Sequence, residues 1–255
     1  MSITKPYHRL WRTLKGYDWS NNMTFGNPVP TLKYLCDDRF ATQAEMQSLV
    51  TTAHLIVRDL YELFNYVEPH DDNKGTYSHR IYELFLRTAT EFESNCKGIL
   101  KANGYAKAEK DMTIRDYFNI AEAAHLSEYR ISFVRWMPIC DFKPFAAWNT
   151  ASYTPLTWYQ SYNKVKHNRY SNFSEANLGN LMDAVSALIC ILHAQLGENV
   201  DEVCFEGFGT SQMQQDEVRN GTFTIKAPSF PDAEQYDFIW DVLKLDPNPV
   251  QNYSF

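Results

Sequence analysis

Three long stretches of apolar residues at three- and four-residue steps constrain this fold more than any other feature. They cover about residues 42–67, 77–101 and 175–196. A stripe with that spacing lies on one face of an α-helix, and helices bury such stripes by packing against one another. The third stretch is apolar on nearly every face over residues 188–192. We therefore predict a mainly α fold, an antiparallel helical bundle with the third helix at its centre.

Local signals place the ends of the helices and a few shorter elements. Thr42 with Glu45 three residues later forms a capping box for the first long helix. Ser174 is the expected cap of the last one. Further elements are predicted in four stretches: helices over 113–129 and 154–167, and short β-strands within 130–136 and 221–225.

The chain of 255 residues is long enough for one large domain with extensions. Residues 42–200 are predicted to form the helical bundle domain. Residues 1–41 carry many turn signals and read as an irregular N-terminal arm. Residues 201–255 contain glycines and prolines among aromatic residues, and we expect them to form a C-terminal extension that packs on the bundle.

Cysteine usage and hydropathy limit the class of protein. The five cysteines are odd in number and widely spaced, without a C-x-x-C pair, which argues against a disulfide framework and against a structural zinc site. The seven histidines form no H-E-x-x-H motif, so no metal and no cofactor is expected. The longest apolar run, about residues 184–192, is far shorter than the ~20 residues that cross a bilayer. We expect a cytoplasmic protein without a membrane partner.

Composition changes sharply between Phe142 and Ser174. This stretch contains no Asp or Glu, although the whole chain has 31 acidic residues and a net charge of −7. It holds nine aromatic rings together with four cations and one histidine, namely Lys143, Lys164, Lys166, Arg169 and His167. Rings that stack on bases beside cations that meet phosphates are typical of surfaces for single-stranded nucleic acid. Rings that anchor loops to the core would give the same composition, and the composition does not decide between the two.

Helical spacing gathers part of this stretch on one face. Tyr159, Asn163 and His167 follow each other at four-residue steps, and Lys166 flanks that face. Arg169 lies just past the expected helix end. The negative end of the helix dipole favours cations there. Lys, His and Arg are also common at helix C-termini for capping alone.

An imidazole beside cations and an amide is a combination suited to the cleavage of RNA. A histidine that titrates near neutral pH can remove the proton of a ribose 2′-hydroxyl. Lys166 and Arg169 would stabilise the negative charge that develops on the phosphate, and Asn163 would hold a phosphate oxygen. This chemistry requires no metal.

The segment Y-N-K-V-K-H (residues 162–167), followed by the helix over 175–196, resembles the HEPN (higher eukaryotes and prokaryotes nucleotide-binding) superfamily. The resemblance covers roughly residues 42–197 and implies a helical bundle. By position, Asn163 matches the polar residue of the family motif and His167 matches its histidine. The motif arginine would fall at residues 160–162, which are Gln, Ser and Tyr. The resemblance implies a homodimer, metal-independent RNA cleavage where the motif is complete, and a setting in toxin–antitoxin, abortive-infection or antiviral defence systems.

The sequence therefore predicts a site for RNA or a nucleotide at the end of the 154–167 helix. Arg80, at the start of the second long helix, would supply the missing cation if it faces the same site. The alternative is a non-catalytic protein–protein interaction module, with the aromatic segment 236–255 as its docking element. The residues expected to act in catalysis are His167, Asn163 and Lys166, and those expected to bind substrate are Arg169, Tyr159, Tyr162, Lys164, Tyr170 and Arg80.

Overall fold

The computed structural model of the chain describes residues 3–15, 38–39, 42–197, 212–214, 217–219 and 222–255. The chain is mainly helical, as predicted. The helices are α2 (Gln43–Leu63), α3 (His79–Ala102), α4 (Ile114–Tyr117), α5 (Ile120–Ala123), α6 (Thr157–His167), α7 (Arg169–Asn172), α8 (Leu178–Leu196) and α10 (Trp240–Leu243). The strands are β1 (Arg130–Phe133), β2 (Gln212–Gln214), β3 (Glu217–Arg219) and β4 (Phe223–Lys226).

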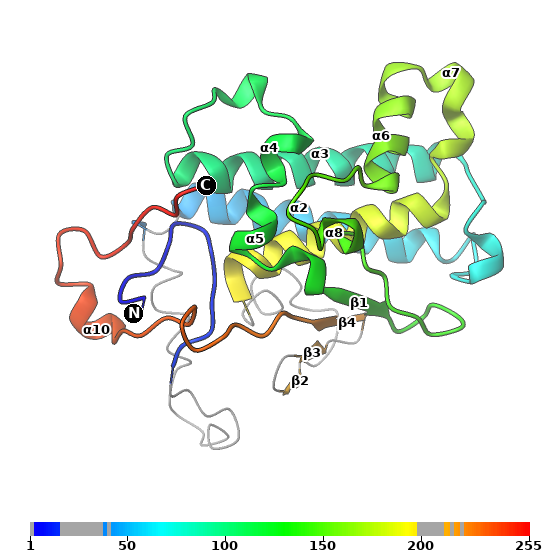
Figure 1. Ribbon diagram of the computed structural model, residues 1–255. Coiled ribbons are helices and arrows are strands. Elements are labelled where there is room, and N and C mark those ends of the chain that lie inside the picture. Colours follow the sequence, from blue (N-terminus) through cyan, green and yellow to red (C-terminus); the bar gives the residue numbers. More distant parts are fainter. Residues whose placement is uncertain (1–2, 16–37, 40–41, 198–211, 215–216, 220–221) are drawn as a thin grey trace.

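The centre of the fold is the packed pair α3 and α8, against which α2 and α6 lie (Figure 1). Every residue from 184 to 196 of α8 is buried, so the prediction of a central third helix is confirmed. By length and composition α8 is the one helix in the described part of the chain that would pass as a membrane span. However, 83% of its apolar window is buried inside the structure, which is the pattern of a core helix in a soluble protein.

The long helices are capped at their N-termini by side chains that accept hydrogen bonds from N–H groups of the first turn. The capping box of α2 is present as predicted, because Thr42 Oγ1 accepts from the N–H of Glu45 at 3.3 Å and the Glu45 carboxylate accepts from the N–H of Thr42. The predicted cap of α8 was wrong by three residues. Ser174 lies in a 3₁₀ turn, and Asn177 caps the helix by accepting from the N–H of Asn180 at 3.0 Å.

The helix predicted over residues 113–129 is broken into α4, α5 and a 3₁₀ turn over 126–128. The Asn119 amide donates to the carbonyl of Asp116 at 2.9 Å, a side-chain bond that competes with the continuing backbone ladder. His125 then adopts a left-handed conformation with φ of 50°. These two local events end the helical pattern although the apolar spacing continues.

A short antiparallel sheet in the order β1-β4-β3-β2 joins the C-terminal extension to the bundle. The strands predicted within 130–136 and 221–225 are confirmed, with somewhat different ends. Ile131 pairs with Ile225 and Phe133 with Phe223, and all four side chains are buried. Because β1 also packs on α8, the sheet contributes these four side chains to the main core.

The N-terminal arm contacts both α8 and the C-terminal extension. The N–H of Trp11 donates to the carbonyl of Ala194 at 2.8 Å, which fixes the arm to the end of α8. The Tyr236 hydroxyl donates to the carbonyl of Leu10 at 2.7 Å. The turn signals that the sequence places within residues 16–37, and the glycines within 198–211, lie outside the described residues. Both chain ends lie at the end of the bundle opposite α6 and α7 (Figure 1).

Candidate functional site

Apart from Arg80 in α3, the predicted site residues belong to α6, α7 and the turn between them, called here the α6–α7 turn (residues 163–170). Asparagine side chains fix this turn. Asn168 Oδ1 accepts from the N–H of Ser171 at 3.3 Å, and the Asn172 amide donates to the carbonyl of Asn168 at 2.8 Å. α6 buries Trp158, Tyr159, Ser161, Tyr162 and Val165 on its inner side, and its other residues are exposed or half-buried.

Most rings of the acid-free stretch anchor loops and helices to the core. The buried ones are Phe142, Phe145, Trp148, Trp158, Tyr159 and Tyr162. Tyr153 and Phe173 are half-buried, and only Tyr170, 98% exposed, presents a free ring. For most of these rings, the interpretation as core anchors is therefore the right one.

Tyr159 and Tyr162 lie in the core, which corrects their expected role as substrate-binding rings. Tyr159 is 5% exposed and Tyr162 is 1% exposed, so neither offers a face to a ligand. The Tyr159 hydroxyl donates to Glu93 Oε1 at 2.6 Å. Burial and this carboxylate raise the pKa of Tyr159 far above its usual range. Helical spacing had placed Tyr159 correctly beside Asn163 and His167, but it did not show that this face meets α3.

In the structure, two acidic residues contact the acid-free stretch between Phe142 and Ser174. Glu175 accepts from Ser161 Oγ at 2.6 Å and pairs with Lys164 Nζ at 3.0 Å, and these two bonds lower the pKa of the Glu175 carboxyl. Glu93 of α3 lies 3.9 Å from Lys166 Nζ. The ammonium of Lys166 also lies 4.9 Å from the centre of the Tyr162 ring. Two of the expected cations are thus locally neutralised.

The pKa of Lys166 reflects this setting. Partial burial acts to lower it, but the Tyr162 hydroxyl and the Glu93 carboxylate outweigh that effect and raise the pKa above its ordinary value. Lys166 therefore stays charged and serves as an ion-pair partner of Glu93. It is poorly suited to give or take a proton.

The outer part of the α6–α7 turn keeps three exposed groups. His167, Arg169 and Tyr170 are all exposed. Among the described residues His167 has no hydrogen-bond or ion-pair partner, and half-buried Asn163 also has none through its amide. The guanidinium of Arg169 lies 5.5 Å from the centre of the Tyr82 ring, which holds it near the surface of α3. Imidazole, guanidinium and phenol are therefore available to a ligand within four consecutive residues.

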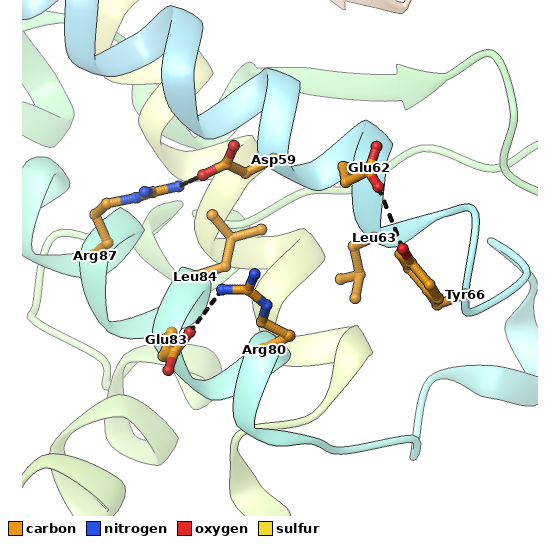
Figure 2. A pocket seen from close by; sticks show the side chains of 8 residues that line it. All are labelled: Asp59, Glu62, Leu63, Tyr66, Arg80, Glu83, Leu84 and Arg87. Atoms are coloured by element: carbon orange, nitrogen blue, oxygen red, sulfur yellow. Dashed lines mark hydrogen bonds and ion pairs between the residues drawn. The ribbon is translucent and has the colours of Figure 1, made fainter.

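Arg80 does not supply the missing cation. It lines a separate hollow between α2 and α3, where its guanidinium donates to Glu83 at 3.2 Å (Figure 2). The other charged residues of that hollow come from the same two helices, and Arg87 pairs with Asp59 across it. No residue of the α6–α7 turn lines this hollow. The charged side chains of this surface form ion pairs with one another, Arg80 with Glu83 and Arg87 with Asp59.

One group of polar residues was not singled out from the sequence. Lys74, Cys140, Lys143 and Asp183 line an open hollow of about 480 Å³ at the first turns of α8. The available signal was Asp183, the one acidic residue of the mostly apolar helix α8. Neither here nor elsewhere in the described part of the chain do three His, Cys, Asp or Glu side chains gather as they would around a metal ion.

Comparison with known protein families, with curated proteins and with solved structures finds no match to this chain.

Proposed function

We propose that the chain is an HEPN-like protein that binds single-stranded RNA, or a nucleotide, through the α6–α7 turn. The observation that carries the proposal is the exposure of Tyr170 beside His167 and Arg169, in a fold whose other rings in this stretch are mostly buried. An exposed tyrosine next to a guanidinium provides a stacking face for a base and a donor for a phosphate.

The charges of the turn predict how this binding responds to salt. Lys164 and Lys166 already pair with Glu175 and Glu93, so Arg169 is the one permanent cation of the turn that remains for a phosphate. Each phosphate contact contributes roughly −0.7 to the slope of log affinity against log salt for a single strand. Stacking on Tyr170 then carries most of the affinity, and the salt slope is shallow, about −0.7.

The resemblance to the HEPN superfamily adds the reaction to this proposal. His167 would take the proton of a 2′-hydroxyl, and the 2′-oxygen would attack the adjacent phosphorus while the 5′-oxygen leaves. The products are a 2′,3′-cyclic phosphate and a 5′-hydroxyl, and the leaving oxygen needs a proton from a second group. A homodimer that pairs two α6–α7 turns would supply that group from the second His167. The defence-system setting follows from the resemblance alone.

The first experiment measures binding of a fluorescein-labelled single-stranded RNA by fluorescence anisotropy at low salt. Tyr170→Ala should weaken binding roughly tenfold, the usual cost of one lost stacking platform. Tyr66→Ala is the matched control, because Tyr66 is also a strongly exposed tyrosine but lies on the hollow between α2 and α3. Equal affinities of the two variants would contradict the proposed surface.

The second experiment tests cleavage with the same RNA, and its products are identified by mass. His167→Ala should abolish cleavage while binding stays within about twofold, because the imidazole contributes the proton transfer and little of the stacking. Cleavage that persists in a folded His167→Ala variant would remove this histidine from the reaction.

One observation favours the alternative of a protein–protein interaction module. In the C-terminal extension Ile239, Val242 and Leu245 are exposed, although Tyr236 and Trp240 nearby are buried. If the wild-type protein binds no RNA even at low salt, this alternative is preferred.

A further inference from the structure

The hollow at the start of α8 differs from the other polar surfaces of the protein because its central acid has no partner. Asp183 is half-buried and lines the hollow. No hydrogen bond and no ion pair to its carboxyl exists among the described residues. Burial raises the pKa of this carboxyl to about 6, and the nearby Lys74 ammonium only partly opposes that effect. A carboxylate removed from water normally has a cation or several donors around it.

The nearest cation is already engaged. Lys74 Nζ lies 2.8 Å from Asp71 Oδ1, and its ammonium lies 5.8 Å from the centres of both the Trp136 and Phe142 rings. The Asp71 carboxylate also accepts from Trp136 Nε1 at 2.8 Å, which fixes the pair in place. Lys74 is therefore held by Asp71 and leaves the Asp183 carboxyl free.

The backbone at the start of α8 does not offer an anion site. The N–H groups of Leu178 and Gly179 donate to the carbonyls of Thr76 and Lys74, and the N–H of Asn180 donates to the Asn177 side chain. All three donors of the first turn are thus satisfied within the protein. The described residues beside Asp183 therefore offer an anion no free N–H group, and the ammonium of Lys74 is already paired with Asp71.

The remaining free groups in the inner part of the hollow are hydrogen-bond acceptors. The Asn180 amide donates to the Glu175 carbonyl, so its Oδ1 is left as an acceptor. Asp141 accepts from Ser132 Oγ at 2.6 Å and is already partnered. Burial raises the pKa of the Cys140 thiol, so Cys140 stays neutral and is no nucleophile. The arrangement suits binding of a ligand and offers no reactive group for a covalent step.

We propose that this hollow binds a small organic cation whose primary ammonium group pairs with Asp183 and donates to Asn180 Oδ1. The hollow of about 480 Å³ is large enough for a short aliphatic amine. The exposed Lys143 at its rim favours a ligand whose outer end is neutral or anionic. This site is separate from the α6–α7 turn and does not depend on RNA binding.

The test uses isothermal titration of the whole protein at pH 7.5 with two matched probes. 4-Aminobutyrate carries an ammonium and an anionic outer end, and 4-hydroxybutyrate replaces the ammonium with a hydroxyl. The aminobutyrate should bind at least about tenfold more tightly, because a charge-assisted hydrogen bond to a half-buried carboxylate is lost with the neutral probe. Equal binding of the two probes, or no binding of either, would overturn the proposal.

Two variants distinguish binding of aminobutyrate at Asp183 from a general attraction of its ammonium group to a protein of negative net charge. Asp183→Asn keeps the shape of the side chain and should reduce aminobutyrate affinity about tenfold. Asp141→Asn removes one acid from the same hollow but leaves the free carboxyl, and should bind as the wild type does. Circular dichroism confirms that each variant is folded. If both variants bind like the wild type, attraction to the net charge explains the signal and the proposed site is wrong.

The pH dependence gives an independent readout. The charged or titratable groups around Asp183 are Lys74 and Asp71 from the turn before α3, and Cys140, Asp141 and Lys143 from the loop before α6. Only Asp183 among them has a pKa raised to about 6. Affinity for aminobutyrate should therefore fall as pH is lowered through 6 in the wild type, and should be flat there in Asp183→Asn. A pH profile shared by both proteins would contradict the assignment.

Discussion

Each end of α8 holds a titratable side chain that is at least partly buried. The two side chains differ in their access to solvent and in their hydrogen-bond partners. At the first turns Asp183 faces an open hollow without a partner. Near the last turn His193 is fully buried, and a hydrogen bond of 2.8 Å joins its Nδ1 to the Tyr129 hydroxyl. The centre of its ring lies 5.3 Å from that of Trp11, in an edge-on arrangement.

The N-terminal arm causes this difference. At the closed end, Arg9 Nε donates to Gln195 Oε1 at 2.8 Å, and the Gln195 amide donates to Asn95 Oδ1 at 2.9 Å. These bonds attach the arm to α8 and α3 and seal this end from solvent, although the buried Trp11 Nε1 and His193 Nε2 have no hydrogen-bond partner among the described residues. At the open end no segment of the described chain covers Asp183, and its unpaired carboxyl is costly for stability. An unpaired polar group that lines an open hollow can be reached by a ligand, whereas the unpaired Nε2 of His193 is sealed in the core.

The largest expected effect tests how tightly the closed end is packed. Gly197 has φ of 58° and ψ of −143°, and an added Cβ would lie 2.2 Å from Trp11 Nε1. Gly197→Ala should therefore lower the free energy of unfolding by about 4 kcal/mol, through backbone strain and displacement of Trp11. Urea denaturation measures this change.

The matched substitution at the open end is Gly179→Ala. The nearest atom to its added Cβ would be Lys74 Cβ at 3.3 Å, a tight but adjustable contact. Alanine also gains helix propensity, so the net change should stay within about 1 kcal/mol. Similar losses at both positions would mean that the two ends do not differ in packing.

The second prediction concerns acid. Burial lowers the pKa of His193 to about 3, whereas an unfolded chain holds the histidine pKa near 6.5. Below pH 6.5 the unfolded chain binds a proton that the folded protein does not, so stability falls as pH drops from 6.5 toward 3. Between pH 6.5 and 4.5 this contribution amounts to about 2.5 kcal/mol.

The variant His193→Gln lacks this titration. Its stability, measured by urea denaturation at several pH values, should fall less steeply than that of the wild type over the same window. Parallel curves for the two proteins would show that His193 is not held in its neutral form by burial.

The third prediction concerns Asp183, whose contribution to stability changes with pH in the opposite direction from that of His193 and is smaller. The pKa of Asp183 is raised to about 6, so its contribution to stability is present below the unfolded value near 3.9 and is lost as pH rises through 6. Asp183→Asn resembles the neutral carboxyl and should raise the free energy of unfolding at pH 7.5 by about 1–2 kcal/mol, with little gain at pH 4. Thermal unfolding at both pH values measures this, and Asp141→Asn should show no such gain. A loss of stability at pH 7.5 would indicate that Asp183 has a partner in solution.

The amino-acid sequence by itself determined where the main helices lie. The spacing of apolar residues and the Thr42–Glu45 box are local signals, because a helix is built from contacts three and four residues apart. The all-round apolar character over 188–192 also identified the central helix, since only a core can bury every face. The exposed turn with His167 and Arg169 was found in the same way, from one helix and its C-terminal end.

Only the tertiary structure decided which of these groups are free. Glu93 is about 70 residues away along the chain from Tyr159 and Lys166, yet it binds one and neutralises the other. The pairing of β1 with β4 and the hollow around Asp183 likewise join segments distant in sequence. Charge and burial at a site depend on every element that packs there, and sequence spacing reports only on neighbours within one element.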